Sequence, residues 1–238
     1  MTGPDLRKSR QLAGWTQDRL AARLGVTQAY LSLMERGYRT VPNHVTRATT
    51  RVLHLPASHL PLPAPSSFDV PATEHWVEQA LARLEYPGFA YRRKPGAKRN
   101  PTELLLRALA YDNLGPRLTE ALPWLLLRFE KFDFETLAGL AKLRDLQNRL
   151  GFTVSLALQV AEHDPRWTSR VQELRRLEKF LEPSRLARED TYGRVETSDR
   201  MREWLRHQRS RAAEHWNLLT DLKMEQLPYA GENHGALA

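Results

Sequence analysis

The fold of the N-terminal part is decided by residues 15–37, which read WTQDRLAARLGVTQAYLSLMERG. Two short helices joined by a tight turn are predicted here, because Thr16 and Thr27 stand where a side-chain oxygen can cap a helix start. Gly25 follows the first helix and supplies the left-handed residue that commonly ends one. Gly37 ends the second helix. The buried stripe of the first helix is expected to consist of Leu20, Ala21 and Leu24.

The second of these helices has an apolar face and a free face. Leu31 and Met34 recur at helical spacing and are expected to point into the core. The positions that point elsewhere are Gln28, Ala29, Ser32 and Leu33. A short helix with a free polar N-terminal face fits the major groove of DNA. A glutamine amide also donates and accepts hydrogen bonds at once, as adenine N7 and N6 require.

Residues 4–62 resemble the helix-turn-helix domain of the XRE family, to which the lambdoid phage repressors and many bacterial antitoxins belong. The resemblance is carried by Thr-Gln-x-x-Leu-Ala from residue 16, Gly-Val-Thr from residue 25 and Glu-x-Gly from residue 35. It covers about a quarter of the chain. It implies five short helices at roughly 4–13, 16–24, 27–36, 43–54 and 56–60.

The resemblance implies roles for individual residues. Gln28 is expected to contact a base, the alternative being a solvated helix residue. Ala29 and Leu33 stand where phage repressors often carry polar base-contacting residues, so contacts with thymine methyl groups are expected, with Ser32 on the same face. Tyr30 either stacks on a sugar or packs on the domain. Contacts with DNA phosphates are expected from Gln17, Thr27, Arg36, Arg39 and Lys8, with helix capping as the favoured role of Thr27.

Arg10 and Glu35 occupy positions that form an ion pair in this family. The pair would tie the first helix to the third and would be structural. Removing one partner should cost more than the pair contributes, because the other charge is left buried alone.

The charge of the chain is concentrated in its N-terminal quarter. The 238 residues include 36 Lys and Arg against 28 Asp and Glu, a net charge of +8, so a polyanionic partner is considered first. Residues 1–62 hold nine basic and three acidic residues. This part is therefore expected to face double-stranded DNA.

Several classes of protein are excluded by composition. The chain has no cysteine, which excludes a disulfide scaffold, a thiolate metal site and a cysteine nucleophile. No apolar stretch is long enough to span a membrane, and the first ten residues do not resemble a secretory signal. A cytoplasmic protein without a membrane partner is expected.

Residues 61–72 contain four prolines and are predicted to form an extended, semi-rigid linker. The linker separates a DNA-binding domain at 1–60 from a helical domain at 73–228, and residues 229–238 are expected to be a flexible tail. Apolar residues recur at helical spacing on both sides. The predicted fold class is therefore all-α, with a five-helix lambda-repressor-like domain followed by a larger helical domain.

Within the larger domain, apolar stripes predict helices at about 76–84, 101–109, 118–129 and 171–181, with further helical sequence from 134 to 162. Gly151 is expected to mark either a break or a point of close packing. A single long amphipathic helix of about twenty residues is expected from Met201 to Leu222.

The strongest charge feature of the larger domain is the loop at residues 91–99, YRRKPGAKR. Its five cations are Arg92, Arg93, Lys94, Lys98 and Arg99. They form a second nucleic-acid contact, a docking site for an acidic partner, or a solvated loop.

Enzymatic motifs are weak, and neither catalysis nor a cofactor or metal is expected. The sequence has no His-Glu-x-x-His, no glycine-rich phosphate loop and no Gly-x-Ser-x-Gly. Arg202 and His207 have the spacing seen in HEPN ribonucleases, but such spacings arise by chance in a chain this rich in arginine. Glu203, His207, Arg211 and His215 step by four and are interpreted as an intrahelical charge ladder.

Residues 100–109, 122–125 and 142–152 resemble helical regions of antitoxins encoded beside nucleotidyltransferase toxins of the AbiEii kind. The leading hypothesis is a sequence-specific repressor that binds operator DNA as a homodimer. Its larger domain would neutralise a cognate toxin, which makes the protein an antitoxin. The alternatives are a regulator that senses a ligand or oligomerises, and, third, a HEPN-like ribonuclease.

Overall fold

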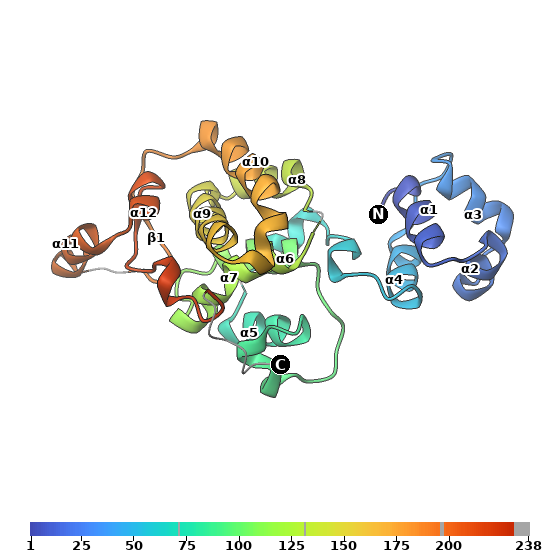
Figure 1. Cartoon of the computed structure of the whole chain (residues 1–238), viewed down its shortest axis with the longest axis horizontal. Helices are drawn as coiled ribbons and strands as arrows, with labels where there is room; N and C mark the ends of the chain where they lie inside the picture. The colour runs from blue at the N-terminus through green and yellow to red at the C-terminus, as the bar shows by residue number, and fades with distance from the viewer. Residues whose placement is uncertain (71, 131, 196–197, 231–238) are drawn as a thin grey trace. The chain divides into compact units, whose positions relative to one another are not determined.

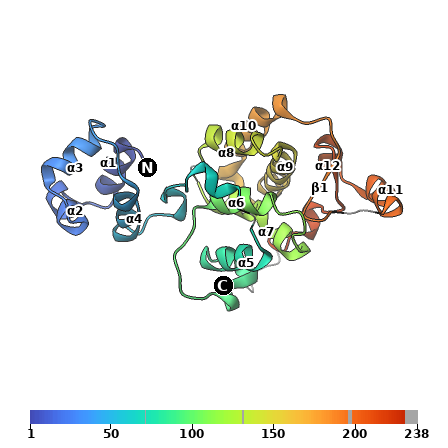
Figure 2. The same ribbon diagram turned by 180° about the vertical axis from the view of Figure 1, so that it is seen from behind.

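The computed structural model describes residues 1–70, 72–130, 132–195 and 198–230. It is mostly helical, as the all-α fold class predicted, and the chain divides into two compact units, Met1–Pro63 and Ala64–Ala238. No helix in the described ranges is long and apolar enough to cross a membrane. Figures 1 and 2 show the helices of both units.

The first unit, Met1–Pro63, is a small helical domain around one core. Its helices are α1 (Gly3–Leu12), α2 (Gln17–Leu24), α3 (Gln28–Glu35) and α4 (Asn43–Val52), followed by the 3-10 turn η1 (Ala57–His59). The fully buried centre consists of Leu6, Leu20, Ala21, Leu31, Met34 and Val45.

Helices α2 and α3 begin and end at the capping residues that the sequence predicts. The side chain of Thr16 accepts a hydrogen bond from the backbone of Arg19, and that of Thr27 accepts one from Tyr30. Gly25 ends α2 in the left-handed conformation, with φ 69°. These caps satisfy backbone donors and carbonyls that a helix end leaves without partners.

The fifth expected helix, at 56–60, is present as a single turn of 3-10 helix. The structure has only the 3-10 turn at Ala57–His59, after which Leu60 is extended. Leu60 precedes Pro61, and a proline disfavours the helical conformation of the residue before it.

The expected linker at 61–72 is too long. Residues Pro65–Phe68 form the 3-10 turn η2, and the side chain of Phe68 is buried. Arg144 holds this segment, because its Nη2 donates to the carbonyl of Pro65 and to Oδ1 of Asp69, both at 2.9 Å. Residues from Ala64 onward therefore belong to the second unit, and Pro71 lies outside the described residues.

The second unit contains eight described α-helices and a two-stranded parallel sheet. The helices are α5 (Glu74–Arg83), α6 (Pro101–Leu109), α7 (Pro116–Arg128), α8 (Phe134–Lys142), α9 (Gln147–His163), α10 (Val171–Leu181), α11 (Asp199–Gln208) and α12 (Arg211–His215). The 3-10 turns are η3 (Pro87–Arg92), η4 (Pro165–Arg170), η5 (Glu182–Ser184) and η6 (Met224–Gln226). Strands β1 (Asp190–Thr191) and β2 (Leu218–Leu219) pair with Asp190 opposite Leu218.

Helix α9 is the centre of the second unit. From Gln147 to Ala161 every residue except Gln159 is buried. It packs against α7, α8, α10 and α12, which surround it in Figure 1. A helix that is buried on nearly all sides is expected at the centre of a unit.

Two buried arginines hold helix ends against this centre. Arg149 of α9 donates to the carbonyl of Leu109 at 2.8 Å and forms ion pairs with Asp112 and Asp190. Arg170 donates to the carbonyls of Leu126 and Phe129 at the end of α7. The carbonyls at a helix end have no partner within the helix, so these guanidinium groups take that place.

The long helix expected from Met201 to Leu222 is wrong. Helix α11 ends at Gln208, Arg209 is extended, and Ser210 caps the new helix α12. Asn217 then has φ 52° and leads into β2. Only the second half of the apolar period is buried, at Trp216, Leu219 and Leu222, and no single helix carries these three residues.

Gly151 is a point of close packing and not a break. It lies inside α9, and a Cβ atom built on it would stand 2.5 Å from ring atoms of the fully buried Trp216. The indole Nε1 of Trp216 donates to Oγ of Ser155 at 2.9 Å, one turn further along α9.

The start of the expected tail at 229–238 is packed. The hydroxyl of Tyr229 donates to the carbonyl of Glu120 at 2.8 Å, and Arg166 donates to the carbonyl of Tyr229. The remainder of the tail from residue 231 lies outside the described residues.

We expect Gly151→Ala to lower the free energy of unfolding of the second unit by about 1–3 kcal/mol, because the methyl group overpacks the contact with Trp216. Gly139→Ala is the matched control, since Gly139 is an exposed helical glycine with open space around its Cβ position. It should be neutral or stabilise by up to about 1 kcal/mol. Denaturant unfolding followed by circular dichroism measures both, and equal effects would contradict the assignment.

Candidate nucleic-acid interface

Helix α3 separates its residues into a core face and a surface face. Leu31 and Met34 are fully buried, whereas Gln28 and Ala29 at its start are exposed. The other two expected base contacts, Ser32 and Leu33, are half-buried one turn later. The structure therefore brings all four expected base-contacting residues onto α3 outside its buried face.

The predicted ion pair and two glutamines to which the sequence assigned separate roles form one chain of hydrogen bonds. Nε2 of Gln28 donates to Oε1 of Gln17 at 2.6 Å. Nε2 of Gln17 in turn donates to Oε2 of Glu35 at 2.8 Å. Glu35 is paired with Arg10. The exposed start of α3 is thus linked to the interior of the domain.

The inner end of this chain is a buried, two-point ion pair. Arg10 donates from Nε to Oε1 of Glu35 at 2.6 Å and from Nη2 to Oε2 at 2.9 Å. The side chains are 10% and 1% exposed, respectively. The third nitrogen, Nη1, donates to the carbonyl of Trp15 at 2.7 Å, just before α2. One guanidinium group therefore joins α1, the start of α2 and the end of α3.

The electrostatics of the pair favour its charged form. Burial raises the pKa of the Glu35 carboxyl, but hydrogen bonds from Arg10 and Gln17 outweigh burial, so its pKa lies below the ordinary value. The hydrogen bond to Glu35 raises the pKa of Arg10 against the opposing effect of burial. Both groups are therefore ionised at neutral pH.

The expected phosphate contacts are spread along the helix-turn-helix. Thr27 uses its hydroxyl oxygen to cap α3, which leaves its hydrogen available to a phosphate. Arg36 and Arg39 are exposed just beyond the end of α3, whereas Lys8 is exposed on α1. Arg36 is steadied by a bond from Nε to the carbonyl of Ser32 and lies over the ring of Tyr38.

Arg19 is a cation of α2 that the sequence interpretation did not single out. Its guanidinium lies 4.1 Å from the ring centre of Trp15, a cation–π contact. Trp15 lies just before the cap of α2 and Arg19 in its first turn, so their closeness in sequence was the available signal. Arg19 presents a further positive charge near the start of α2.

Four of the five cations of the basic loop pair with carboxylates of their own domain. Arg92 pairs with Glu78 at 2.7 Å, Arg93 and Lys98 both pair with Glu85, and Arg99 pairs with Glu103. The hydrogen bond from Lys98 lowers the pKa of Glu85. Within the described residues only Lys94 of the five cations forms no ion pair, which weakens the loop as a docking site.

The residues of the ribonuclease hypothesis are not brought together. Arg202 pairs with Glu189, and the side chain of His207 is 74% exposed beside Glu203. Two side chains that are five residues apart on a helix point about 140° away from each other. Arg202 and His207 therefore point in different directions. The charge ladder is interrupted between α11 and α12, where His215 pairs with Glu182 instead.

Comparison with known proteins supports the first unit alone. Residues 6–44 match the family model described as helix-turn-helix, from within α1 to the start of α4. No curated protein and no solved structure matches the chain. The N-terminal unit is therefore an XRE-type helix-turn-helix, and the protein is a DNA-binding transcription regulator. The AbiEii-like resemblance stays a prediction.

The buried pair predicts an acid limit to the stability of the first unit. A carboxyl whose folded pKa is lowered contributes stability that is fully present above its unfolded pKa, about 4.3. That contribution is lost as the pH falls through the lower folded pKa. Glu35→Gln should remove about 3–5 kcal/mol at neutral pH, because Arg10 stays buried without a counter-charge, and should flatten the acid dependence.

Hydrogen exchange of residues 1–63 in the full chain, measured from pH 3 to 7, tests this. Asp18→Asn is the control, since Asp18 is an exposed carboxylate of α2. Wild-type acid sensitivity in the Glu35→Gln variant would show that the pair does not set the limit.

Proposed function

We propose that the protein is a sequence-specific transcriptional repressor that reads its operator with α3. The observation that carries the proposal is the hydrogen-bonded chain from Glu35 through Gln17 to Gln28. It holds an exposed amide at the start of the helix that a helix-turn-helix places in the major groove.

The amide of Gln28 has one donor and one acceptor left for DNA. A primary amide carries two N–H groups and one carbonyl, and one N–H of Gln28 is used on Gln17. The remaining N–H and carbonyl match adenine N7 and N6. Ala29 and Leu33 would contact thymine methyl groups, with Ser32 beside them.

The amide of Gln17 also keeps a free donor. Its carbonyl accepts from Gln28 and one N–H is used on Glu35, so the second N–H can meet a phosphate at the start of α2, where a helix favours an anion. Thr27, Lys8, Arg36 and Arg39 would supply further phosphate contacts. Because one short helix reads few bases, we propose that a homodimer binds a two-fold symmetric operator.

For the second unit we propose that a cognate toxin is the partner, which makes the protein an antitoxin. What supports a protein partner is α11, which stands at the edge of the unit in Figure 1 and has no buried residue among Asp199–Gln208. Met201 and Trp204 are 41% and 47% exposed. Large apolar side chains in such positions are typical of contacts with other proteins.

Gln28→Ala should weaken binding to the selected operator by about 1–3 kcal/mol and change binding to random DNA little, because a base contact is lost and the phosphate contacts remain. Gln17→Ala should weaken both, since it removes a phosphate contact and the support of Gln28. Fluorescence anisotropy with operator and scrambled duplexes at two salt concentrations measures this. Equal losses on both duplexes for Gln28→Ala would overturn its role as a base reader.

Trp204→Ala combined with Met201→Ala should abolish co-purification with the product of the adjacent gene and rescue of growth from it, because the apolar contact of α11 is removed. Phe180→Ala is the matched control, since Phe180 of α10 is 45% exposed on another helix. Operator affinity should be unchanged in both. An intact complex in the double variant would show that the partner binds a surface other than α11. If the wild-type protein does not bind the product of the adjacent gene, the antitoxin proposal is contradicted.

A further inference from the structure

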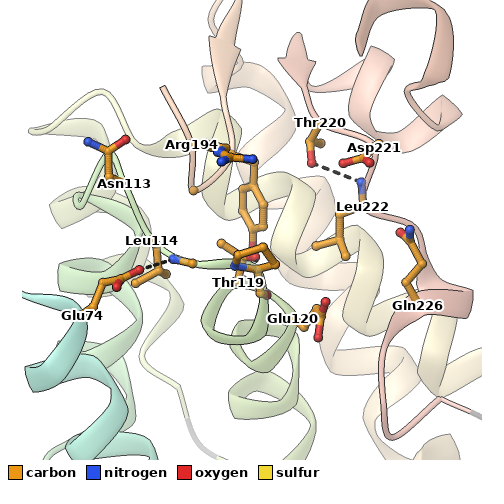
Figure 3. Close-up of a pocket in the computed structure, with 14 residues that line it drawn as sticks. Glu74, Asn113, Leu114, Thr119, Glu120, Arg194, Thr220, Asp221, Leu222 and Gln226 are labelled. Carbon is orange, nitrogen blue, oxygen red and sulfur yellow. Dashed lines mark hydrogen bonds between the residues drawn. The ribbon is translucent and has the colours of Figure 1, made fainter. Parts of the chain in front are cut away.

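The second unit contains a cavity of about 560 Å³ that the proposed functions do not use. Its wall comes from four stretches of the chain: the start of α5, residues 113–120, residues 192–194 and residues 220–226 (Figure 3). A volume of this size lies within the range of small-molecule sites in proteins.

Part of the wall is fixed by internal hydrogen bonds. Oε1 of Glu74 accepts from the backbone N–H of Gly115 at the start of α7, at 2.5 Å. The hydroxyl of Thr119 donates to the carbonyl of Pro116, and the hydroxyl of Tyr192 shares a hydrogen bond with that of Thr153. These contacts define the shape of the cavity and leave its remaining polar groups for an occupant.

Two carboxylates in the wall have no hydrogen bond or ion pair among the described residues, namely Glu120 of α7 and Asp221 after β2. Both lie on the side of Gln226 in Figure 3. Burial raises the pKa of Glu120 more than the positive charge of Arg117 lowers it. The charge of Arg117 therefore does not compensate for the burial of the Glu120 carboxyl.

One guanidinium in the wall is equally free within the described part of the chain. Arg194 forms no ion pair or side-chain hydrogen bond there, and neither does the amide of Asn113, whose backbone forms a bridge with that of Arg194. Among the described residues only Oε1 of the Gln226 amide has a partner, the backbone N–H of Lys223, so its amide N–H groups have none there. Besides Glu74, which accepts from the backbone of Gly115, the charged groups of the wall are thus two carboxylates and one guanidinium without a partner among the described residues.

We propose that this cavity binds a small basic zwitterion of the amino-acid class, with two cationic groups and one carboxylate. The cationic groups would meet Glu120 and Asp221, and the carboxylate would meet Arg194. Charge-assisted hydrogen bonds of this kind are the strong ones in proteins. An organic ligand fits better than a metal ion, because no group of three potential metal ligands is found among the described residues.

The site is independent of operator recognition, since every residue that lines it belongs to the second unit. Failure of the DNA-binding experiment would not contradict the proposed ligand site. Failure of the ligand-binding experiment would not contradict the proposed operator recognition.

The test is isothermal titration of the full chain with L-lysine, L-arginine and putrescine. We expect saturable one-to-one binding of lysine or arginine. Glu120→Gln and Asp221→Asn should each weaken it about tenfold, the usual effect of losing a charged hydrogen bond. Arg194→Gln should weaken binding of the amino acid and leave binding of putrescine, which has no carboxylate, unchanged.

Glu225→Gln is the matched control, because Glu225 is an exposed carboxylate next to Gln226 and does not line the cavity. It should bind as the wild type does, and thermal unfolding of each variant shows that it is folded. No binding of either amino acid, or equal losses in Glu225→Gln and Glu120→Gln, would overturn the proposal. Putrescine binding as tightly as the better amino acid would overturn the part assigned to Arg194.

Discussion

The buried pair of Arg10 and Glu35 is the constraint on which the DNA-binding unit depends. Its charges are withdrawn from water, so loss of either partner would leave the other buried without a counter-charge. The pair also bonds the backbone of Trp15 and the amide of Gln17. The cost of burying the charges is therefore offset by contacts that fix where α2 begins and where α3 ends. The position of Gln28 at the exposed start of α3 is therefore linked to contacts in the core of the domain.

Local sequence signals were sufficient where the structure is itself local. Thr16, Gly25 and Thr27 act on their own helix ends, so their types predicted α2 and α3 correctly. The family resemblance supplied the pairing of Arg10 with Glu35, twenty-five positions apart. Neither showed that Gln17 lies between Gln28 and Glu35, because such a link depends on how α2 packs against α3.

The errors arose where contacts distant in sequence override local patterns. Four prolines favoured an extended linker, yet Arg144, far along the chain, holds residues 65–69 to the second unit. The helical period from Met201 to Leu222 was interpreted as one helix. In the structure the helix is interrupted between α11 and α12, and Trp216 packs against Gly151 of α9. Tyr229 was assigned to a tail and is held by Glu120 of α7. The cavity could not be foreseen, since its wall comes from four separate stretches.

The hydrogen bond between Gln28 and Gln17 also bears on how tightly the helix-turn-helix binds DNA. A free glutamine on a surface samples many rotamers, and freezing it on contact with a base costs conformational entropy. Here part of that freedom is given up when the domain folds, before DNA arrives, and such preorganisation strengthens binding mainly by reducing the cost of association. Under the proposed role of Gln28 as a base reader, the same hydrogen bond restricts the bases that its amide can reach. A new operator preference at Gln28 would then require a compatible change at Gln17.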